Sequence, residues 1–143
     1  MIYPPFNSII PKFSQIHGIF AKDTVHSDIF PDVFENEIKD RIAGNILVAH
    51  NETFDRSVFI RTLEFYELDY DSIMNDLKIP NVQQWECTMR IYRKYRFVSA
   101  GLKYLSDDLG IELQHHDALS DARASAELYY KHLQKDFQAK LSK

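Results

Sequence analysis

The stretch NILVAHNETFD, residues 45–55, is the part of the chain that most restricts its fold. Its apolar run, Ile46 to Ala49, is too apolar on both faces for an edge strand and predicts a short buried strand. Asn51 can then cap a helix that reaches about Tyr66. A buried strand followed at once by a helix favours an α/β layer over a helical bundle. The residues of this helix that we expect to face inward are Phe54, Val58 and Leu63.

The remaining periodic segments add one strand and several helices. A helix is expected over about Pro31 to Ile42, with Gly44 as its stop. Trp85 to Thr88 is a second and weaker candidate strand. Further helices are expected over about Met89 to Arg96, from Gly101 to Leu109 with Gly110 marking the end, and from Asp117 or Ala118 to about Lys135.

Composition bounds the class of protein. With 143 residues and 45% hydrophobic content, we expect one globular domain over residues 1–143. Cys87 is the single cysteine, and the first residues lack the pattern of a signal peptide, which favours a cytoplasmic location. No apolar stretch approaches the roughly 20 residues needed to cross a bilayer, so we expect no membrane partner. The net charge of -4 means that any binding of nucleic acid must be local.

Two helix starts share one pattern. HNETFD puts Asp55 in the opening turn of one helix, and HHDALSDA puts Asp121 in the opening turn of another. The positive helix end favours the ionised form, so we expect both carboxylates to be anions at neutral pH and able to bind Mg²⁺. Either aspartate alone is more often structural, and His50 is more often a packed, hydrogen-bonded residue than a ligand. The occurrence of two such aspartates, each in the first turn of a helix, is what favours a metal-binding site.

His116 lies five residues before Asp121, a turn of about 140° in a helix, so the two cannot share a helical face. His116 must therefore lie in the loop ahead of the helix if both side chains point at one site. An accessible histidine with a pKa near 6.5 suits a general base that takes a proton from water. Asp121 should border the packing stripe of the helix, which we expect to be Ala118, Ala122, Ala126 and Tyr129.

HNETFD resembles the HNxxFD element, and HHDALSDA the HxAxxDA element, of the DEDDh 3′-to-5′ exonucleases. This family includes the proofreading epsilon subunit of the bacterial replicative polymerase and ribonuclease T. Other segments follow in the family's order and extend the resemblance over nearly the whole chain. They are PP at 4–5, IHGI at 16–19, FPDVF at 30–34, CTM at 87–89 and GLKYLSDDLGI at 101–111.

The resemblance implies a ribonuclease H-like fold, with a mixed sheet flanked by helices, and hydrolysis of phosphodiesters at the 3′ ends of DNA or RNA. In the family, four carboxylates hold two Mg²⁺ or Mn²⁺ ions across the scissile phosphate. The implied partners are single-stranded 3′ ends in replication or repair, and a DNA polymerase or a partner chain that completes the sheet. The implied metal ligands are Asp55 and Asp121, the implied catalytic base is His116, and the implied contacts to the terminal nucleotide are His17, Gly18 and Ile19.

One departure from the family concerns its first motif, an Asp-x-Glu on the first strand, which occurs nowhere in these 143 residues. We therefore expect an N-terminally truncated domain in which the first three strands and two of the four carboxylates are absent and metal binding is impaired. Glu35 and Glu37 are better explained as a solvated helix face. Two hypotheses remain: a DEDDh exonuclease represented by its C-terminal part, and an inactive exonuclease-fold remnant that binds nucleic acid or serves in assembly.

The stretch from Arg90 to Lys103 holds five basic residues, no acid and three interleaved aromatic residues. This composition suits the phosphates and bases of a single strand. It is equally typical of a solvated helix face whose aromatic side chains are buried, so both interpretations stay open.

Overall fold

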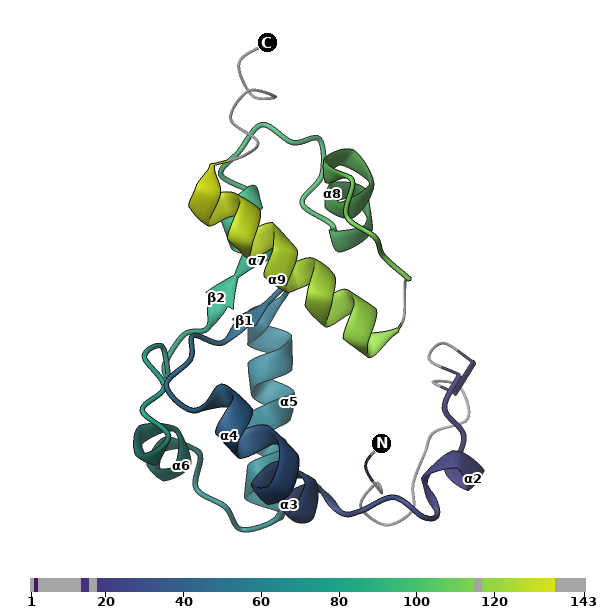
Figure 1. Cartoon of the computed structure of the whole chain (residues 1–143), viewed down its shortest axis with the longest axis vertical. Helices are drawn as coiled ribbons and strands as arrows, with labels where there is room; N and C mark the ends of the chain where they lie inside the picture. The colour runs from purple at the N-terminus through teal and green to yellow at the C-terminus, as the bar shows by residue number, and fades with distance from the viewer. Residues whose placement is uncertain (1, 3–13, 16–17, 115–116, 136–143) are drawn as a thin grey trace. The chain divides into compact units, whose positions relative to one another are not determined.

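The computed structural model describes residues 2, 14–15, 18–114 and 117–135. The chain divides into two compact units. Figure 1 labels their helices and strands. The first unit comprises residues 1–45 and 60–80, and the second comprises residues 46–59 and 81–143. Throughout the described parts of the chain, no helix combines the length and the apolar character needed to span a membrane.

A helical run dominates the first unit. It consists of α3 (Phe30–Val33), the π-helical segment η2 (Phe34–Ile38) and α4 (Lys39–Ile42). Pro31 lies in the first turn, where its missing N–H needs no partner, and Gly44 follows the end with a left-handed φ of 69°. The helix expected from about Pro31 to Ile42 is confirmed. Its π-helical middle is a feature that the 3.6-residue spacing did not predict.

Aromatic packing holds this unit together. The ring of Phe30 stacks on that of Phe34, with centroids 5.6 Å apart, and on that of Tyr66 at 6.0 Å. Two short helices, α2 (Ala21–Thr24) and α6 (Tyr70–Asp76), also belong to the unit. Its buried apolar residues are Phe30, Phe34, Leu63, Tyr70, Met74 and Ile79.

The second unit contains the sheet. β1 (Val48–Ala49) pairs in parallel with β2 (Glu86–Cys87), and each strand lies within the range expected for it, Ile46 to Ala49 and Trp85 to Thr88. Two expectations need correction. The run from Ile46 is not fully buried, because Ile46 is 48% exposed. A strand residue is buried only where other elements cover both faces of the strand. The sheet is also not mixed, because the described residues form two parallel strands and otherwise helices and loops.

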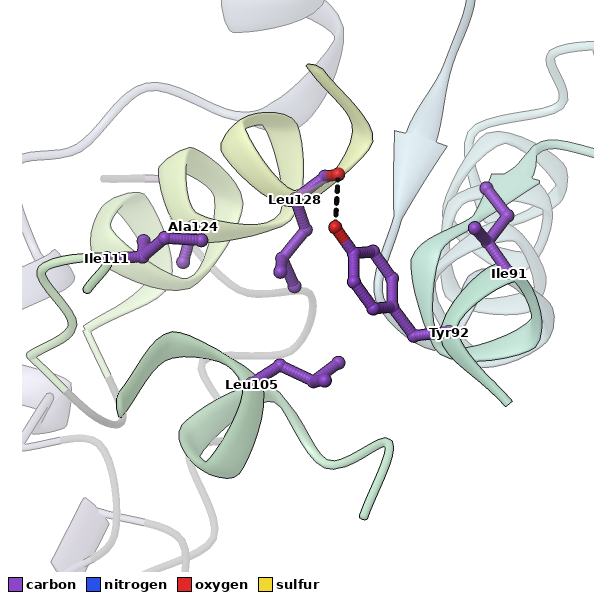
Figure 2. Packing of buried hydrophobic residues seen from close by; sticks show 6 residues of the cluster. All are labelled: Ile91, Tyr92, Leu105, Ile111, Ala124 and Leu128. Carbon is purple, nitrogen blue, oxygen red and sulfur yellow. Dashed lines mark hydrogen bonds between the residues drawn. The ribbon is translucent and has the colours of Figure 1, made fainter. Parts of the chain in front are cut away.

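Helix α9 (Ala118–Gln134) is the centre of the second unit. It packs against β1, α7 (Thr88–Tyr92) and α8 (Leu102–Leu109). The Tyr92 hydroxyl reaches into this core and donates a 3.0 Å hydrogen bond to the Leu128 carbonyl (Figure 2). Because both groups are buried, this bond fixes how α7 meets α9. The core cluster consists of Ile91, Tyr92, Leu105, Ile111, Ala124 and Leu128.

Helix α5 (Glu52–Phe65) follows β1, as the sequence predicted, but a different face of it is buried. Leu63 is fully buried, whereas Phe54 is 63% exposed and Val58 is 46% exposed, so the expected inward face is wrong for these two residues. The physical reason is Glu52, which is only 2% exposed and is held by ion pairs. Because Glu52 lies on the buried face of α5, Phe54 and Val58 lie on the exposed face.

Candidate active site

The carboxyl ends of the two strands bring a pair of side chains together. Ala49 lies opposite Cys87 in the parallel register, so His50 and Thr88 are the next residues along the two chains. His50 Nδ1 lies 3.0 Å from Thr88 Oγ1, and Thr88 is fully buried. The Met89 N–H donates to the His50 carbonyl at 3.1 Å. His50 is therefore a hydrogen-bonded residue fixed at the end of the sheet, as the sequence favoured.

The start of α5 places Asp55. The backbone N–H groups of Phe54 and Asp55 donate to the Asn51 carbonyl at 2.9 and 3.4 Å, so the helix begins immediately after the end of β1. Asp55 lies in its first turn. The short connection leaves Asp55 close in the chain to His50, at the same end of the sheet.

The start of α9 places Asp121. Asp117 caps this helix by accepting a 2.7 Å hydrogen bond from the Ser120 N–H through Oδ1. Ser120 Oγ in turn accepts from the Gln114 N–H at 2.8 Å, so the residues on both sides of 115–116 are tied to the helix start. Asp121 lies in the first turn, and its Oδ1 atom is buried.

The packing face of α9 differs from the expected one. Ala118, Ala122 and Ala126 are exposed, and Tyr129 is half-buried. The buried residues of this helix are Ala124, Ser125 and Leu128. The larger Leu128, which contacts Tyr92, sets the orientation of the helix, and the three exposed alanines do not. Asp121 consequently lies at the head of the buried stripe, where Ser125 Oγ donates to its carbonyl at 2.8 Å.

A cleft of about 450 Å³ lies where these elements of the second unit meet. Asp55 and Asp121 both line it, together with His50 and Asn51 from the end of β1. Two first-turn carboxylates that are far apart in the sequence therefore face one cleft. The other lining residues are Val48, Ala49, Trp85, Leu102, Ala118, Ala122 and Ser125.

A comparison with protein families decides the identity of this fold. The family model described as Exonuclease matches residues 1–129, which is most of the chain and includes residues of both units. The chain belongs to the exonuclease family. Searches of the curated proteins and of the solved structures found no match. The resemblance to DEDDh exonucleases is thus confirmed at the level of the family, and membership implies a nuclease with a ribonuclease H-like α/β fold and a nucleic-acid substrate.

The other implied site residues of this exonuclease are only partly described. His116 and His17 lie outside the described residues. Gly18 and Ile19 belong to the first unit, and the Gly18 N–H donates to the Ser14 carbonyl at 2.8 Å. Gly18 is exposed and has a φ of 70°, a conformation that a side chain would strain. Their contact with a terminal nucleotide stays a prediction.

Partial burial changes the charge behaviour of the cleft. It raises the pKa of Asp55 above its ordinary value, and the nearby Glu52 carboxylate acts in the same direction, while the backbone N–H of Asp55 opposes both. For Asp55, the loss of solvent thus outweighs the stabilisation of the anion that the helix dipole provides. Burial lowers the pKa of His50, and the Arg93 charge adds to this, while the Ala100 backbone and the Asp121 carboxylate oppose it.

Exonucleases of this family generally use divalent metal ions, so the donors of the cleft matter. Among the described residues, no three His, Cys, Asp or Glu side chains gather into a group that could hold a metal ion. Asp55 and Asp121 suit one hard cation that completes its shell with water and phosphate. Two carboxylates are too few to fix two ions a few ångströms apart. The described part of the cleft therefore offers too few donors to fix the two ions of the family's reaction.

Glu52 is a structural residue of the site that sequence reasoning missed. Its carboxylate lies 3.3 Å from Arg90 Nη1 and 3.3 Å from Arg56 Nε. Arg90 Nη2 also donates to the Trp85 carbonyl at 3.1 Å, which ties the start of α5 to the chain ahead of β2. The spacing of Glu52 and Arg56, four residues apart on a helix, was the available signal for part of this network.

Proposed function

We propose that this chain of the exonuclease family acts at the 3′ ends of single-stranded nucleic acid, with DNA as the first substrate and RNA as the second. The reaction is hydrolysis of the terminal phosphodiester in the 3′-to-5′ direction. The observation that supports this most directly is the position of Asp55 and Asp121, which line one cleft at the end of β1. The order of HNETFD and HHDALSDA in the sequence gives both aspartates a metal-binding role by resemblance.

Each side chain has a distinct role in this proposal. Asp55 and Asp121 are the residues that would hold a divalent cation, which when bound would supply positive charge to favour ionisation of the attacking water. His116, the residue before the helix-capping Asp117, accepts the proton of that water. His50, neutral at pH 7, keeps the end of β1 in place through Thr88 and carries no charge that would compete with the cation.

The whole chain takes part in this function. The family match begins at residue 1 and ends at residue 129, so it includes residues of the first unit as well as the second. We therefore propose that the two units form one exonuclease-like domain. By resemblance, we assign His17, Gly18 and Ile19 to contacts with the terminal nucleotide.

The second candidate function is nucleic-acid binding without catalysis. The observation that favours it is the donor count, because the described residues offer two carboxylates to the cleft and no group of three metal-binding side chains. A cation held by two carboxylates neutralises phosphate charge, yet it does not orient both the attacking and the leaving oxygen. On this alternative the chain recognises a strand and does not cut it.

The distinguishing experiment measures metal binding and end recognition before turnover. Mn²⁺ binding is followed by electron paramagnetic resonance in the wild type, Asp55→Asn and Asp121→Asn. Asp40→Asn, which changes an exposed acid of the first unit, serves as the charge control. We expect weak Mn²⁺ binding that both cleft variants lose and the control keeps, and tighter Mn²⁺-dependent binding of a 3′-hydroxyl strand than of a 3′-phosphate strand. Unchanged Mn²⁺ binding in both cleft variants would overturn the metal-site assignment.

Turnover tests whether the site is complete in this chain. With two carboxylates in the cleft, we expect no measurable Mn²⁺-dependent release of nucleotides from a 3′-labelled single strand by this chain alone. Release that His116→Ala abolishes would instead show that the site is complete as it stands. If binding is indifferent to Mn²⁺ and to the chemistry of the 3′ end, the non-catalytic alternative is correct. The coding sequence upstream of Met1 gives an independent test, since a strand with Asp-x-Glu there supports the enzyme.

A further inference from the structure

The aromatic side chains of the basic stretch are occupied in the core of the second unit. Tyr92 is fully buried and bonded to the Leu128 carbonyl, and the ring of Phe97 lies 5.4 Å from that of Tyr92. The Tyr95 hydroxyl lies 2.9 Å from Nδ1 of His132. Tyr92 is therefore engaged inside the core, and Tyr95 and Phe97 are partly buried against the same core.

The basic side chains of the same stretch fall into two groups. Arg90 is paired with Glu52, and Lys103 is paired with Asp107 at 3.0 Å. Arg93, Lys94 and Arg96 are exposed, and none of them forms an ion pair with a described residue. Three exposed cations that have no ion-pair partner among the described residues, close together in the chain, leave a local positive surface on a protein whose net charge is -4.

A cavity of about 370 Å³ adjoins the first of these cations, Arg93. Arg93 lines it together with Ser99 and Gly101, and Gly101 is followed directly by Leu102, which lines the candidate cleft. The charge of Arg93 also reaches His50 in the cleft, where it lowers the pKa of the imidazole. The cavity and the cleft are thus neighbours within the second unit, and a strand with its end in the cleft could extend past Arg93.

We propose that Arg93, Lys94 and Arg96, with the adjoining cavity at Ser99, form a phosphate-contact surface for the single strand whose 3′ end occupies the cleft. This inference rests on the proposed function for the direction of the strand. Binding here is through the sugar-phosphate backbone and not through the bases, because the exposed groups are three cations, whereas the aromatic residues of the stretch pack against the core. The surface therefore holds strands of different sequence equally well.

The test removes the three charges and follows the salt dependence of binding. A fluorescein-labelled oligothymidylate is titrated with the wild type and with R93Q/K94Q/R96Q in EDTA, so that neither metal nor catalysis contributes. Neutralising a phosphate of a single strand contributes about -0.7 to the slope of log K against log salt, so the variant's slope should be shallower by about 2. At low salt its affinity should fall by roughly tenfold or more.

The matched control carries the same change of net charge. K22Q/R41Q/K78Q removes three exposed cations from the first unit and should leave the slope close to that of the wild type. Equal losses in the two triple variants would overturn the proposal, since net charge alone would then explain binding. A preference of roughly tenfold between oligothymidylate and oligoadenylate would overturn the backbone-only mode. Since EDTA removes metal, failure here leaves the Mn²⁺ results for Asp55 and Asp121 unaffected.

Discussion

His50 Nδ1 and Thr88 Oγ1 meet at 3.0 Å because their strands are parallel and in register, with Ala49 opposite Cys87 just before them. The contact joins the end of β1 to the start of α7 beside the candidate cleft. Parallel strands bring their carboxyl ends to one edge, which is where ligand sites of α/β sheets are found. The pair therefore sets the position of the residues that follow β1, Asn51 and Asp55 among them.

Replacing Thr88 by valine should lower the free energy of unfolding by about 1–3 kcal/mol. Valine fills the same buried space but leaves His50 Nδ1 without its partner. Urea denaturation of the wild type and the variant measures the loss. The same substitution in a His50→Ala background should cost clearly less. Equal costs in the two backgrounds would show that the hydrogen bond is not the cause.

The lowered pKa of His50 predicts a pH dependence of stability. The folded protein holds the His50 proton less tightly than the unfolded chain, whose histidine has a pKa near 6.5. Above that pH both states are neutral. As pH falls below it, the unfolded chain binds more protons and the free energy of unfolding decreases, until the folded-state pKa is passed. Urea midpoints of the wild type and His50→Asn, measured between about pH 5 and 8, should therefore diverge with pH. A constant difference contradicts this assignment.

Glu52→Gln should destabilise the second unit by about 2 kcal/mol, because charge-assisted hydrogen bonds to Arg56 and Arg90 are weakened at a buried carboxylate. Asp107→Asn is the comparison. It breaks the pair with Lys103, in which both side chains are 66% exposed, and should cost less than about 1 kcal/mol. Thermal unfolding of the two variants and the wild type measures both losses of stability. Similar losses would mean that the burial of Glu52 has no energetic consequence.

Local chemistry made much of this fold predictable. Gly44 and Gly110 end helices in the left-handed conformation, with φ of 69° and 68°, and Asp117 caps α9. Such signals act within a few residues, so helix ends could be placed from the sequence. The strand Val48–Ala49 was located for the same reason, since its apolar run is bounded by polar residues, whereas the segment from Trp85 to Thr88 gave a weaker signal.

Contacts between residues far apart in the chain could not be predicted from the sequence. The buried face of α5 depends on Glu52 meeting Arg90, and the buried face of α9 depends on Leu128 meeting Tyr92. Neither partner can be identified from helical periodicity, which reports only how residues repeat along one helix. The placement of Asp55 and Asp121 together came from the family resemblance, and the pKa direction of Asp55 required its actual degree of burial.

Asp55→Asn should stabilise the metal-free protein at pH 7. A raised pKa means that folding disfavours the ionised carboxylate, and at pH 7 the ionised form is present in both states. The amide removes this cost, and the gain should stay below about 1 kcal/mol because solvent screens the partly exposed group. The advantage should shrink as pH falls through the folded-state pKa, where the wild type takes up a proton. Mn²⁺ should raise the melting temperature of the wild type more than that of Asp55→Asn, since a ligand of the folded state stabilises it. A variant less stable than the wild type at pH 7 without metal would show that the Asp55 carboxylate is structural.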